Sequence, residues 1–441
     1  MTAIQYQEKF NRIAEQTSFR LLNGEDQDFL KNQAMKYQFT LQELQLVSDM
    51  ALDRLRWKEP GISAAWNQVA RQSDCVNKKQ TSISAEKKKF FSGLRQQHES
   101  LRSGAKDYKQ LSLQDKPKTQ KPQLAIKVKS RLGLGRCPVA SEKTRCCNLL
   151  TLDAVEKCGF DCSYCSIQSF YHGNKVTFDE SFAEKLNSLE LDPETTYHIG
   201  TGQSSDSLLW GNHLGVLDAL SEFATAHPNV ILELKTKSRN IRWLLDHDYP
   251  PNIICTWSLN PQTIIEHEEH LTASLEQRIV SAQQIASKGR LVGFHFHPIV
   301  YYDGWADDYK NICTDITQRF SPDSVALFSL GTLTFTRSVM KTIRKRPLTS
   351  KILQMPMEEI AGKFSYPLDI KIEMFKNVFD ALTPWHEKVF CYLCMEAQSL
   401  WSPVFGYEYQ TNAELELAMK DAYFSKIQRV KDSQSANLMG N

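Results

Sequence analysis

The sequence predicts an α/β protein, a partial β/α barrel of about six parallel strands preceded by a small helical N-terminal module. Two observations indicate the barrel: β-rich runs alternate with helical patterns from residue 148 onward, and polar residues stand at the C-terminal ends of several runs. A third, helical periodicity within residues 1–72, indicates the module. A doubly wound sheet is the alternative, because the periodicity alone does not show that the sheet curves.

The composition indicates a soluble globular protein with about two or three domains. Of 441 residues, 41% are hydrophobic and 24% are charged, which is ordinary for that class. We expect no membrane span, since no run of about 18 apolar residues occurs. The first residues lack the basic start and apolar stretch of a secretion signal. Eleven cysteines without such a signal favour a reducing compartment, so the expected location is cytoplasmic.

Residues 1–72 are expected to form the helical module. The run Thr40-Leu41-Gln42-Glu43 is a capping box, a pattern that starts helices. Apolar residues then recur on one helical face: Leu41, Leu44, Val47, Ala51 and Leu55. A helix pair here is either a plain packing module or a DNA-reading helix-turn-helix.

Residues 73–145 are expected to form a basic linker with short helices, for example around Phe90 to Leu101. Residues 76–145 contain 18 Lys and Arg against 5 Asp and Glu, although the whole chain carries only +2. Such a block is either a solvated linker or a surface that attracts the phosphates of nucleic acid.

The barrel domain is expected over residues 146–410, followed by a C-terminal helix and tail over 411–441. The predicted strands are Leu149–Val155, Thr196–Gly202, Val230–Lys237, Ile253–Asn260, Leu291–Tyr301 and Val325–Phe335. The predicted helices between them are Leu214–Ala226, Ile241–Asp246, Leu275–Ser287 and Trp305–Arg319. Strand, helix and strand repeated in this way indicate parallel strands joined by crossovers.

The most informative motif is Cys-Gly-Phe-Asp-Cys-Ser-Tyr-Cys, in which Cys158, Cys162 and Cys165 have C-x3-C-x2-C spacing. Three thiolates on one loop can hold three irons of a 4Fe–4S cluster and leave the fourth iron open. S-adenosylmethionine can chelate that iron and be cleaved to a 5'-deoxyadenosyl radical. The alternatives are a zinc site, which commonly needs a second ligand pair, and incidental cysteines.

Several strand-end motifs accompany the cysteines. They are Ser205-Asp206, Thr236-Lys237, Ser258-Leu259-Asn260 and the segment from Gly293-Phe294 through His297-Pro298-Ile299 to Asp303-Gly304-Trp305. With the cysteine loop, these motifs make residues 148–410 resemble radical S-adenosylmethionine enzymes of the spore photoproduct lyase, or DNA repair photolyase-like, family.

The resemblance implies a cofactor pocket and its lining residues. Those at strand ends are Ser205, Asp206, Lys237, Ser258, Asn260 and His297, and Tyr164 in the cysteine loop would face adenine. The chemistry agrees, because a lysine cation can pair with the methionine carboxylate and hydroxyls suit the amino group and ribose.

The sequence departs from the family at the hydrogen-atom donor. The family has a cysteine two residues before the serine matching Ser205, and here that position is Gln203. An amide N–H bond is far stronger than a thiol S–H bond, so a replacement is expected. Cys394 ends a predicted strand that also holds Cys391 and Tyr392. Our hypothesis is that Cys394, with Tyr392 or Tyr366, donates the hydrogen atom; the alternative is a buried structural cysteine.

These features predict a radical S-adenosylmethionine lyase that acts on nucleic acid, with a pyrimidine photolesion in DNA as the expected substrate. The expected partners are DNA, held by residues 76–145, and an electron donor such as flavodoxin or ferredoxin. One alternative is radical modification of RNA or a peptide. Another is a non-enzymatic iron–sulfur or zinc protein that binds nucleic acid through its first 145 residues.

Overall fold

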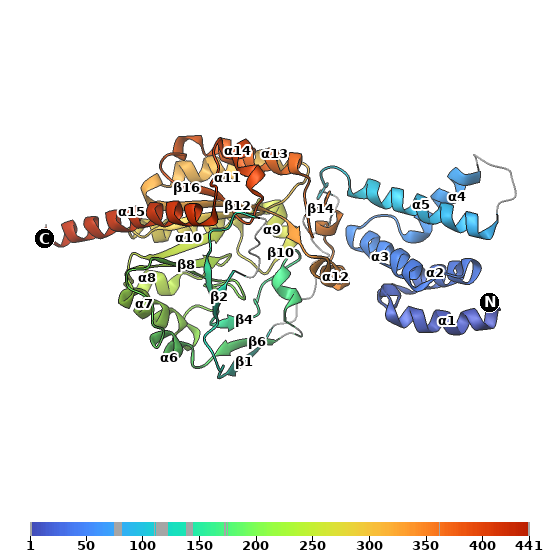
Figure 1. The fold of residues 1–441 in the computed structure, drawn as a ribbon, viewed down its shortest axis with the longest axis horizontal. Coiled ribbons are helices and arrows are strands. Elements are labelled where there is room, and N and C mark those ends of the chain that lie inside the picture. The colour runs from blue at the N-terminus through green and yellow to red at the C-terminus, as the bar shows by residue number, and fades with distance from the viewer. Residues whose placement is uncertain are drawn as a thin grey trace. The chain divides into compact units, whose positions relative to one another are not determined.

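The computed structural model describes residues 2–74, 82–109, 111, 122–137, 144–171, 173, 175–360 and 362–439. The chain divides into two compact units (Figure 1). The helical unit comprises Met1–Lys118 and Phe335–Glu358, and the barrel unit comprises Thr119–Thr334 and Glu359–Asn441. Each unit is built from two separate stretches of chain.

The helical unit is made of helices with a shared apolar centre. Their bounds are α1 (Ala3–Gln16), η1 (Ser18–Leu21), α2 (Gly24–Tyr37), α3 (Leu41–Trp57), α4 (Ile62–Asp74), α5 (Ile83–Arg102), α12 (Arg337–Lys345) and η6 (Ile352–Gln354). The capping box predicted at the start of α3 is present: Glu43 N donates to Thr40 Oγ1 at 3.2 Å, and Thr40 N donates to Glu43 Oε2 at 2.8 Å.

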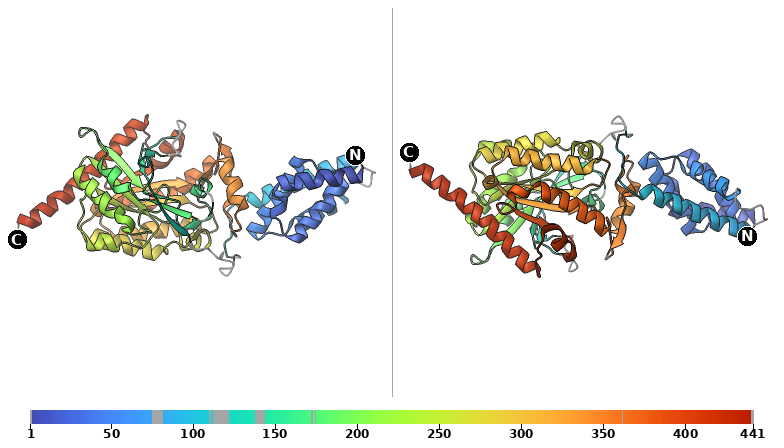
Figure 2. Two further views of the ribbon diagram at one scale, coloured as in Figure 1. Left: turned by 90° about the horizontal axis from the view of Figure 1, so that it is seen from below. Right: turned by 90° about the horizontal axis from the view of Figure 1, so that it is seen from above.

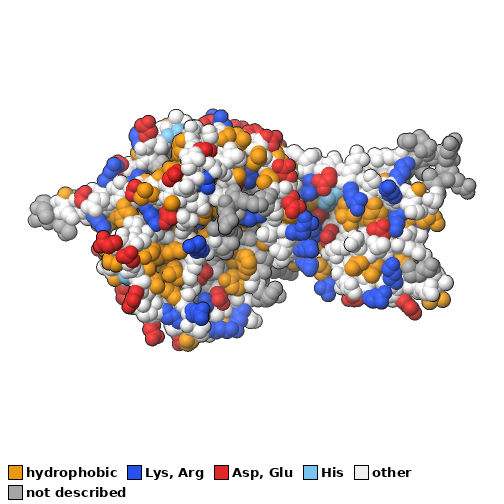
Figure 3. All heavy atoms as spheres, in the orientation of Figure 1, with side chains coloured by type: hydrophobic (Ala, Val, Ile, Leu, Met, Phe, Trp, Pro, Cys, Tyr) orange, Lys and Arg blue, Asp and Glu red, His pale blue; other side chains and the backbone are white. Residues whose placement is uncertain are grey.

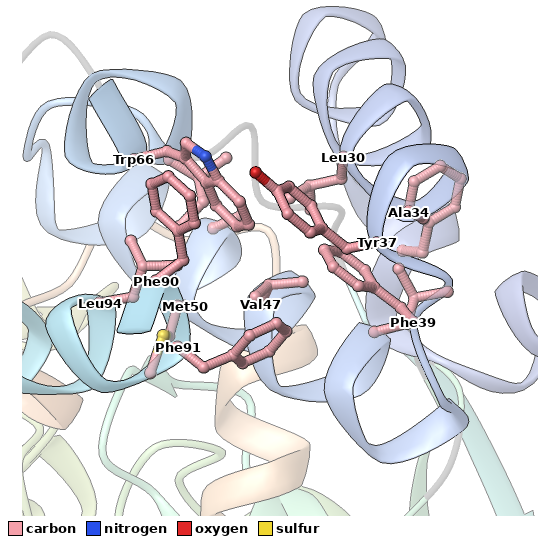
Figure 4. Packing of buried hydrophobic residues seen from close by; sticks show 14 of the residues in the cluster. Leu30, Ala34, Tyr37, Phe39, Val47, Met50, Trp66, Phe90, Phe91 and Leu94 are labelled. Carbon is pink, nitrogen blue, oxygen red and sulfur yellow. The ribbon is translucent and has the colours of Figure 1, made fainter. Parts of the chain in front are cut away.

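Aromatic side chains fill the centre of the helical unit (Figure 4). The Trp66 ring stacks on Phe90 with 4.7 Å between ring centroids, and Phe39 meets Phe91 edge to face at 5.3 Å. Tyr37 joins these pairs, with its ring centroid 5.8 Å from that of Trp66 and 6.5 Å from that of Phe39. The helices are therefore held by one continuous aromatic core.

Part of the stretch expected as a linker belongs to this core. Residues 83–102 form the single helix α5, on which Phe90, Phe91 and Leu94 are buried. The lysine-rich composition conceals this apolar face, because only a few of the helix's residues point inward. Residues 75–81, 110, 112–121 and 138–143 of the expected linker lie outside the described residues.

The barrel unit contains one eight-stranded sheet in the order β16-β12-β11-β9-β8-β7-β3-β2. Its strands are β2 (Leu134–Arg136), β3 (Leu150–Leu152), β7 (Tyr197–Thr201), β8 (Val230–Thr236), β9 (Ile253–Ser258), β11 (Val292–Ile299), β12 (Val325–Thr332) and β16 (Phe390–Leu393). Neighbouring strands are parallel except β2, which is antiparallel to β3. The predicted partial β/α barrel is confirmed.

Helices follow the strands as the sequence predicts, and they cover the outer face of the sheet (Figure 2). They are α7 (Val216–Ala226), α8 (Arg242–Asp246), α10 (Leu275–Ser287), α11 (Trp305–Arg319) and α13 (Leu368–Ala381). All eight residues of β12 are buried, as expected for a parallel strand covered on both faces. Because these strands are parallel, their C-terminal ends, where the polar residues stand, lie together at one rim of the sheet.

The remaining elements are short. Most belong to the barrel unit, and β13 and β14 lie where the chain passes from one unit to the other. They are β1 (Gln123–Lys127), β4 (Val155–Glu156), β5 (Asp161–Cys162), η3 (Ser166–Ser169), β6 (Lys175–Asp179), α6 (Phe182–Asn187), η4 (His213–Gly215), α9 (Gln262–Glu268), β10 (Glu269–His270), η5 (Pro322–Ser324), β13 (Thr334–Phe335), β14 (Glu358–Ile360), β15 (Lys363–Ser365), η7 (Thr383–Trp385), η8 (Gln398–Leu400) and α14 (Trp401–Phe405). Strands β1, β6 and β4 form a small sheet of their own.

The chain's last described element is α15 (Asn412–Met439), a 28-residue helix that extends beyond the sheet (Figure 2). Its buried apolar residues recur every four positions and face β8, β12 and β16: Leu415, Met419, Tyr423 and Ile427. On the face of the barrel unit in Figure 3, acidic and basic side chains are interspersed. Within the described ranges, no helix has the length and hydrophobicity of a membrane span.

Candidate active site

The cysteine loop is fastened to the segment that follows α9. Strand β5 of the loop pairs antiparallel with β10, which places Cys162 opposite Glu269. The next residue, Ser163, donates its backbone N–H to Glu268 O at 2.8 Å, and its hydroxyl also donates to the Glu268 carboxylate. The loop that presents the thiols is therefore tied at its centre to the barrel.

The three cysteines line one cavity of about 100 Å³, which we call the loop cavity. Its other lining residues are Phe160, Tyr164, Ile167, Gly202, Ser205, Asp206, Lys235, Thr236, Lys237 and Ser258. Five residues predicted for the cofactor thus lie around the thiols: Tyr164, Ser205, Asp206, Lys237 and Ser258. They follow β7 or β8, end β9, or come from the loop itself.

The thiols suit an iron–sulfur cluster by their chemistry. Burial raises the pKa of Cys158 and of Cys162, so their thiolates need a strongly positive partner such as iron. The backbone N–H of Phe160 points at Cys158 Sγ, with 3.4 Å between nitrogen and sulfur. Among the described residues, no group of three or more His, Cys, Asp or Glu side chains is arranged around a single metal ion.

Two side chains in the loop cavity have polar groups free for a ligand. Ser205 Oγ is buried and has no hydrogen-bond partner, which is costly unless a ligand supplies one. The ammonium of Lys237 lies 6.0 Å from the ring centroid of Tyr164, and no hydrogen bond or ion pair engages it within the described chain. The methionine part of S-adenosylmethionine carries an amino group and a carboxylate. A hydroxyl and a cation in the same cavity as three thiols are suited to bind these two groups.

Asp206 is fully occupied by protein groups, although it lines the same cavity. Its Oδ1 accepts from the backbone N–H of Leu208 and Leu209 and from Thr236 Oγ1, at 3.1, 2.8 and 2.7 Å. Its Oδ2 accepts from Lys237 N at 2.6 Å. Burial raises the pKa of Asp206. The carboxylate therefore joins the turn after β7 to the end of β8 and positions Lys237.

Asn260 does not line the loop cavity and also holds protein groups. Its side-chain nitrogen donates to Glu269 Oε1 at 2.7 Å, and its oxygen accepts from Tyr309 OH at 2.6 Å. Glu269 in turn accepts a hydrogen bond from the hydroxyl of Tyr164 and pairs with Arg278, Nη2 to Oε2 at 2.5 Å. This buried network supports the cysteine loop from behind.

A second cavity of about 60 Å³, which we call the inner cavity, adjoins the first through Lys235, which lines both. The residues predicted for hydrogen transfer lie here, because Tyr392, Cys394 and Gln203 all line it. His297 also lines this cavity rather than the loop cavity. Tyr366 lies elsewhere, and its hydroxyl accepts from Tyr301 N at 3.1 Å.

A buried polar network closes the inner cavity around Glu233. Its carboxylate bonds to His198 Nε2 at 3.0 Å, His295 Nε2 at 2.7 Å and Thr256 Oγ1 at 2.9 Å. Burial alone would raise the pKa of Glu233, but the charge and hydrogen bonds of His295 and His198 hold it well below its usual range. Burial lowers the pKa of His295 to about 4.

The arrangement defines the class of protein. A partial β/α barrel carries a three-cysteine loop over the C-terminal ends of its strands, which is the architecture of radical S-adenosylmethionine proteins. Residues 132–368, more than half of the chain, match the family model described as spore photoproduct lyase. The chain belongs to the spore photoproduct lyase family.

Curated relatives share part of this sequence. The spore photoproduct lyase of Clostridium acetobutylicum is 26% identical over 223 residues, which are 49% of this chain and 64% of that protein. The Bacillus subtilis enzyme is 26% identical over 123 residues, which are 27% of this chain and 36% of that protein. The matches therefore span less than two thirds of these relatives.

Solved structures share the fold. A spore photoproduct lyase complexed with dinucleoside spore photoproduct aligns with a TM-score of 0.52 at 18% identity, covering 65% of this chain and 88% of that chain. A double mutant of spore photoproduct lyase with bound AdoMet and dinucleoside spore photoproduct aligns over the same shares with a TM-score of 0.51.

The sequence reasoning missed two charged residues of the site, Glu233 and Lys235. Both precede Lys237 on β8 at intervals of two, and alternate residues of a strand share one face. That spacing could have placed them beside the predicted Lys237. The reasoning also missed Arg278, which is buried on α10 and gives no local sign of its partner Glu269.

Proposed function

We propose that this chain is a radical S-adenosylmethionine enzyme that acts on nucleic acid, with a pyrimidine photolesion in DNA as its substrate. The observation that carries the proposal is the pair of adjoining cavities: three thiols, Ser205 and Lys237 line one, and Cys394 lines the other, together with Cys137, Cys146 and Cys147. Family membership and the dinucleoside bound in related structures support the substrate class.

In this proposal, Cys158, Cys162 and Cys165 hold a 4Fe–4S cluster. Lys237 pairs with the carboxylate of S-adenosylmethionine, and Ser205 and Ser258 bond its polar groups. When bound, the cluster and S-adenosylmethionine supply reductive cleavage of the sulfonium to a 5'-deoxyadenosyl radical. The electron comes from a donor such as flavodoxin or ferredoxin.

Cys394 is the proposed hydrogen-atom donor. Burial raises the pKa of Cys394 to about 12, so the side chain keeps its S–H bond at neutral pH. Transfer to a substrate carbon radical breaks this S–H bond, forms a C–H bond and leaves the unpaired electron on sulfur. Tyr392 lines the same cavity and can pass its phenolic hydrogen atom to that sulfur, leaving a tyrosyl radical.

Anaerobic reconstitution followed by reduction with S-adenosylmethionine tests the radical chemistry. The wild-type protein should bind iron and produce 5'-deoxyadenosine, and the Cys162→Ala variant should lose both. Cys313→Ala is the matched control, since Cys313 is buried on α11 away from the loop cavity. A wild-type protein that binds iron but yields no 5'-deoxyadenosine contradicts the proposal and favours the non-enzymatic alternative.

A second variant pair tests the donor. Cys391 lies on β16 and Cys394 directly follows that strand, and of these two only Cys394 lines either cavity. Cys394→Ala should still cleave S-adenosylmethionine while repaired product fails to form, whereas Cys391→Ala should keep both. Repair by Cys394→Ala at the wild-type rate would exclude Cys394 as donor.

A further inference from the structure

Lys235 is a charged residue of the site to which the proposed chemistry assigns no role. Glu233 and Lys235 on β8, and Lys237 directly after it, alternate along the face that lines the cavities. Glu233 belongs to the inner cavity and Lys237 to the loop cavity, and Lys235 lines both. Its ammonium therefore stands where the two cavities meet, between the residues proposed for the cofactor and Cys394.

The ammonium of Lys235 has no partner in the described chain. No hydrogen bond or ion pair engages its Nζ, and the nearby carboxylates are already occupied: Glu233 by two histidines and Thr256, and Asp206 by four donors. Burial lowers the pKa of Lys235. Lys235 is only partly exposed, and an ammonium in such a place is stabilised by an anionic partner, so a group from outside the chain can complete the site.

The groups around Lys235 favour an anion with more than one oxygen. His297 Nδ1 is buried without a partner, and burial holds the pKa of His297 well below its usual range. In the tautomer protonated at Nδ1, the neutral ring presents this N–H as a donor. Gln203, whose side-chain amide can also donate, lines the same cavity. One cation and two neutral donors match the charge and hydrogen-bonding capacity of a phosphodiester better than a neutral base.

We propose that Lys235 binds the phosphodiester that joins the two nucleosides of the substrate, and so fixes the lesion between the cofactor and Cys394. The inference rests on the proposed function and deepens it, because it names the substrate group that the inner cavity recognises. Lys237 is committed to the cofactor carboxylate in that function, which leaves Lys235 for the substrate.

Two substrates that differ only in this group test the inference. Binding of spore photoproduct as a dinucleotide, with its bridging phosphate, and as a dinucleoside, without it, is measured by calorimetry. The protein is reconstituted with its cluster and holds S-adenosylmethionine without reductant, so no turnover occurs. The wild-type protein should bind the dinucleotide about tenfold to a hundredfold more tightly, as a charge-assisted hydrogen bond gives.

Lys235→Met should abolish the preference for the dinucleotide, and Lys235→Arg should retain part of it. Lys310→Met, at an exposed lysine of α11, is the matched control and should keep the full preference. Iron content and affinity for S-adenosylmethionine should be unchanged in all three variants.

Several outcomes would overturn the assignment. The first is a wild-type protein that binds the dinucleotide and the dinucleoside equally well, or binds neither. The second is a Lys235→Met variant whose affinity for both substrates falls by the same factor. The third is a Lys235→Met variant that loses affinity for S-adenosylmethionine and not for the dinucleotide. Formation of 5'-deoxyadenosine by the same preparation is scored separately, so failure of the radical chemistry is distinguished from failure of the phosphodiester site.

Discussion

Arg278 and Glu269 form an ion pair in which neither side chain has exposed surface, with 2.5 Å between Nη2 and Oε2. Arg278 also donates to the backbone oxygens of Ser258 and Ala273, at 2.8 and 3.0 Å. Glu269 meanwhile holds Tyr164 of the cysteine loop. One buried pair thus connects the end of β9 to the loop that carries the thiols.

Loss of one partner of this pair should be severe. Arg278→Met leaves the Glu269 carboxylate buried without its cation, and we expect the free energy of unfolding to fall by about 3–5 kcal/mol. Denaturant titration of the barrel transition measures the change. Arg242→Met is the control, because its pair with Asp246 is exposed and should contribute less than about 1 kcal/mol. Equal effects of the two substitutions would contradict the prediction.

Gly159, in the cysteine loop, should not tolerate a side chain. A Cβ there would lie 2.7 Å from the Trp210 ring and 2.8 Å from Leu209, so Gly159→Ala must displace the loop at a cost of about 1–3 kcal/mol. We expect reduced iron content after anaerobic reconstitution. A Cβ at Gly135 meets nothing within 4 Å, so Gly135→Ala should bind iron normally. Full iron loading of both variants would show that the loop has room.

His295 should make the protein less stable in mild acid. Its pKa is about 4 in the folded protein and about 6.5 in an unfolded chain. As pH falls from 6.5 to 4, the unfolded chain takes up a proton that the folded protein does not, so stability is lost at up to about 1.4 kcal/mol per pH unit. Stability is regained as pH rises through this window.

Unfolding measured across this pH range checks the prediction. His295→Gln keeps a polar side chain beside Glu233 but removes the titrating group, so its stability should depend less steeply on pH, by about one proton. His213→Gln, outside this network, should retain the wild-type slope. A His295→Gln variant with an unchanged slope would assign the acid sensitivity to other groups.

Arg344 should stabilise the helical unit through a buried carboxylate. Its Nε lies 2.7 Å from Asp53 Oδ1, and the Asp53 side chain is 3% exposed. Arg344→Met should raise amide hydrogen exchange along α3 and lower stability by about 1–3 kcal/mol, because it leaves a buried acceptor without its charged donor. Lys345→Met, at the exposed next residue, should change neither. Unchanged hydrogen exchange in Arg344→Met would show that His98, whose Nε2 lies 3.4 Å from Asp53 Oδ2, is enough to stabilise the buried carboxylate.

The barrel could be predicted from sequence because its signal is local. Each parallel strand is a short apolar run, and polar residues follow it at the rim, so Ser205, Lys237 and Ser258 could be expected together near the cysteines. The placement of Cys394 was predicted from alternation along one strand, and the inner cavity agrees with it.

The remaining features depend on contacts between distant residues. Asn260 ends a strand like Ser258, yet its amide is taken up by Glu269 and Tyr309, and no local pattern reveals such partners. The burial of α5 is equally hidden, because its lysines dominate the composition. The alternation of residues along the strand could have predicted the position of Lys235 beside Lys237. That its ammonium has no hydrogen-bond or ion-pair partner in the described chain follows only from the positions of all its neighbours.

The composition of the helical unit from two stretches of chain has a consequence for biosynthesis. Asp53 and Arg344 are 291 positions apart, so a ribosome must translate nearly all of the sheet before they can meet. Domains generally fold from the N-terminus as they emerge, yet in this one Asp53 lacks the Arg344 cation until the chain beyond strand β12 has been made. A nascent chain halted before residue 335 should therefore be more sensitive to protease within its first hundred residues than the finished protein.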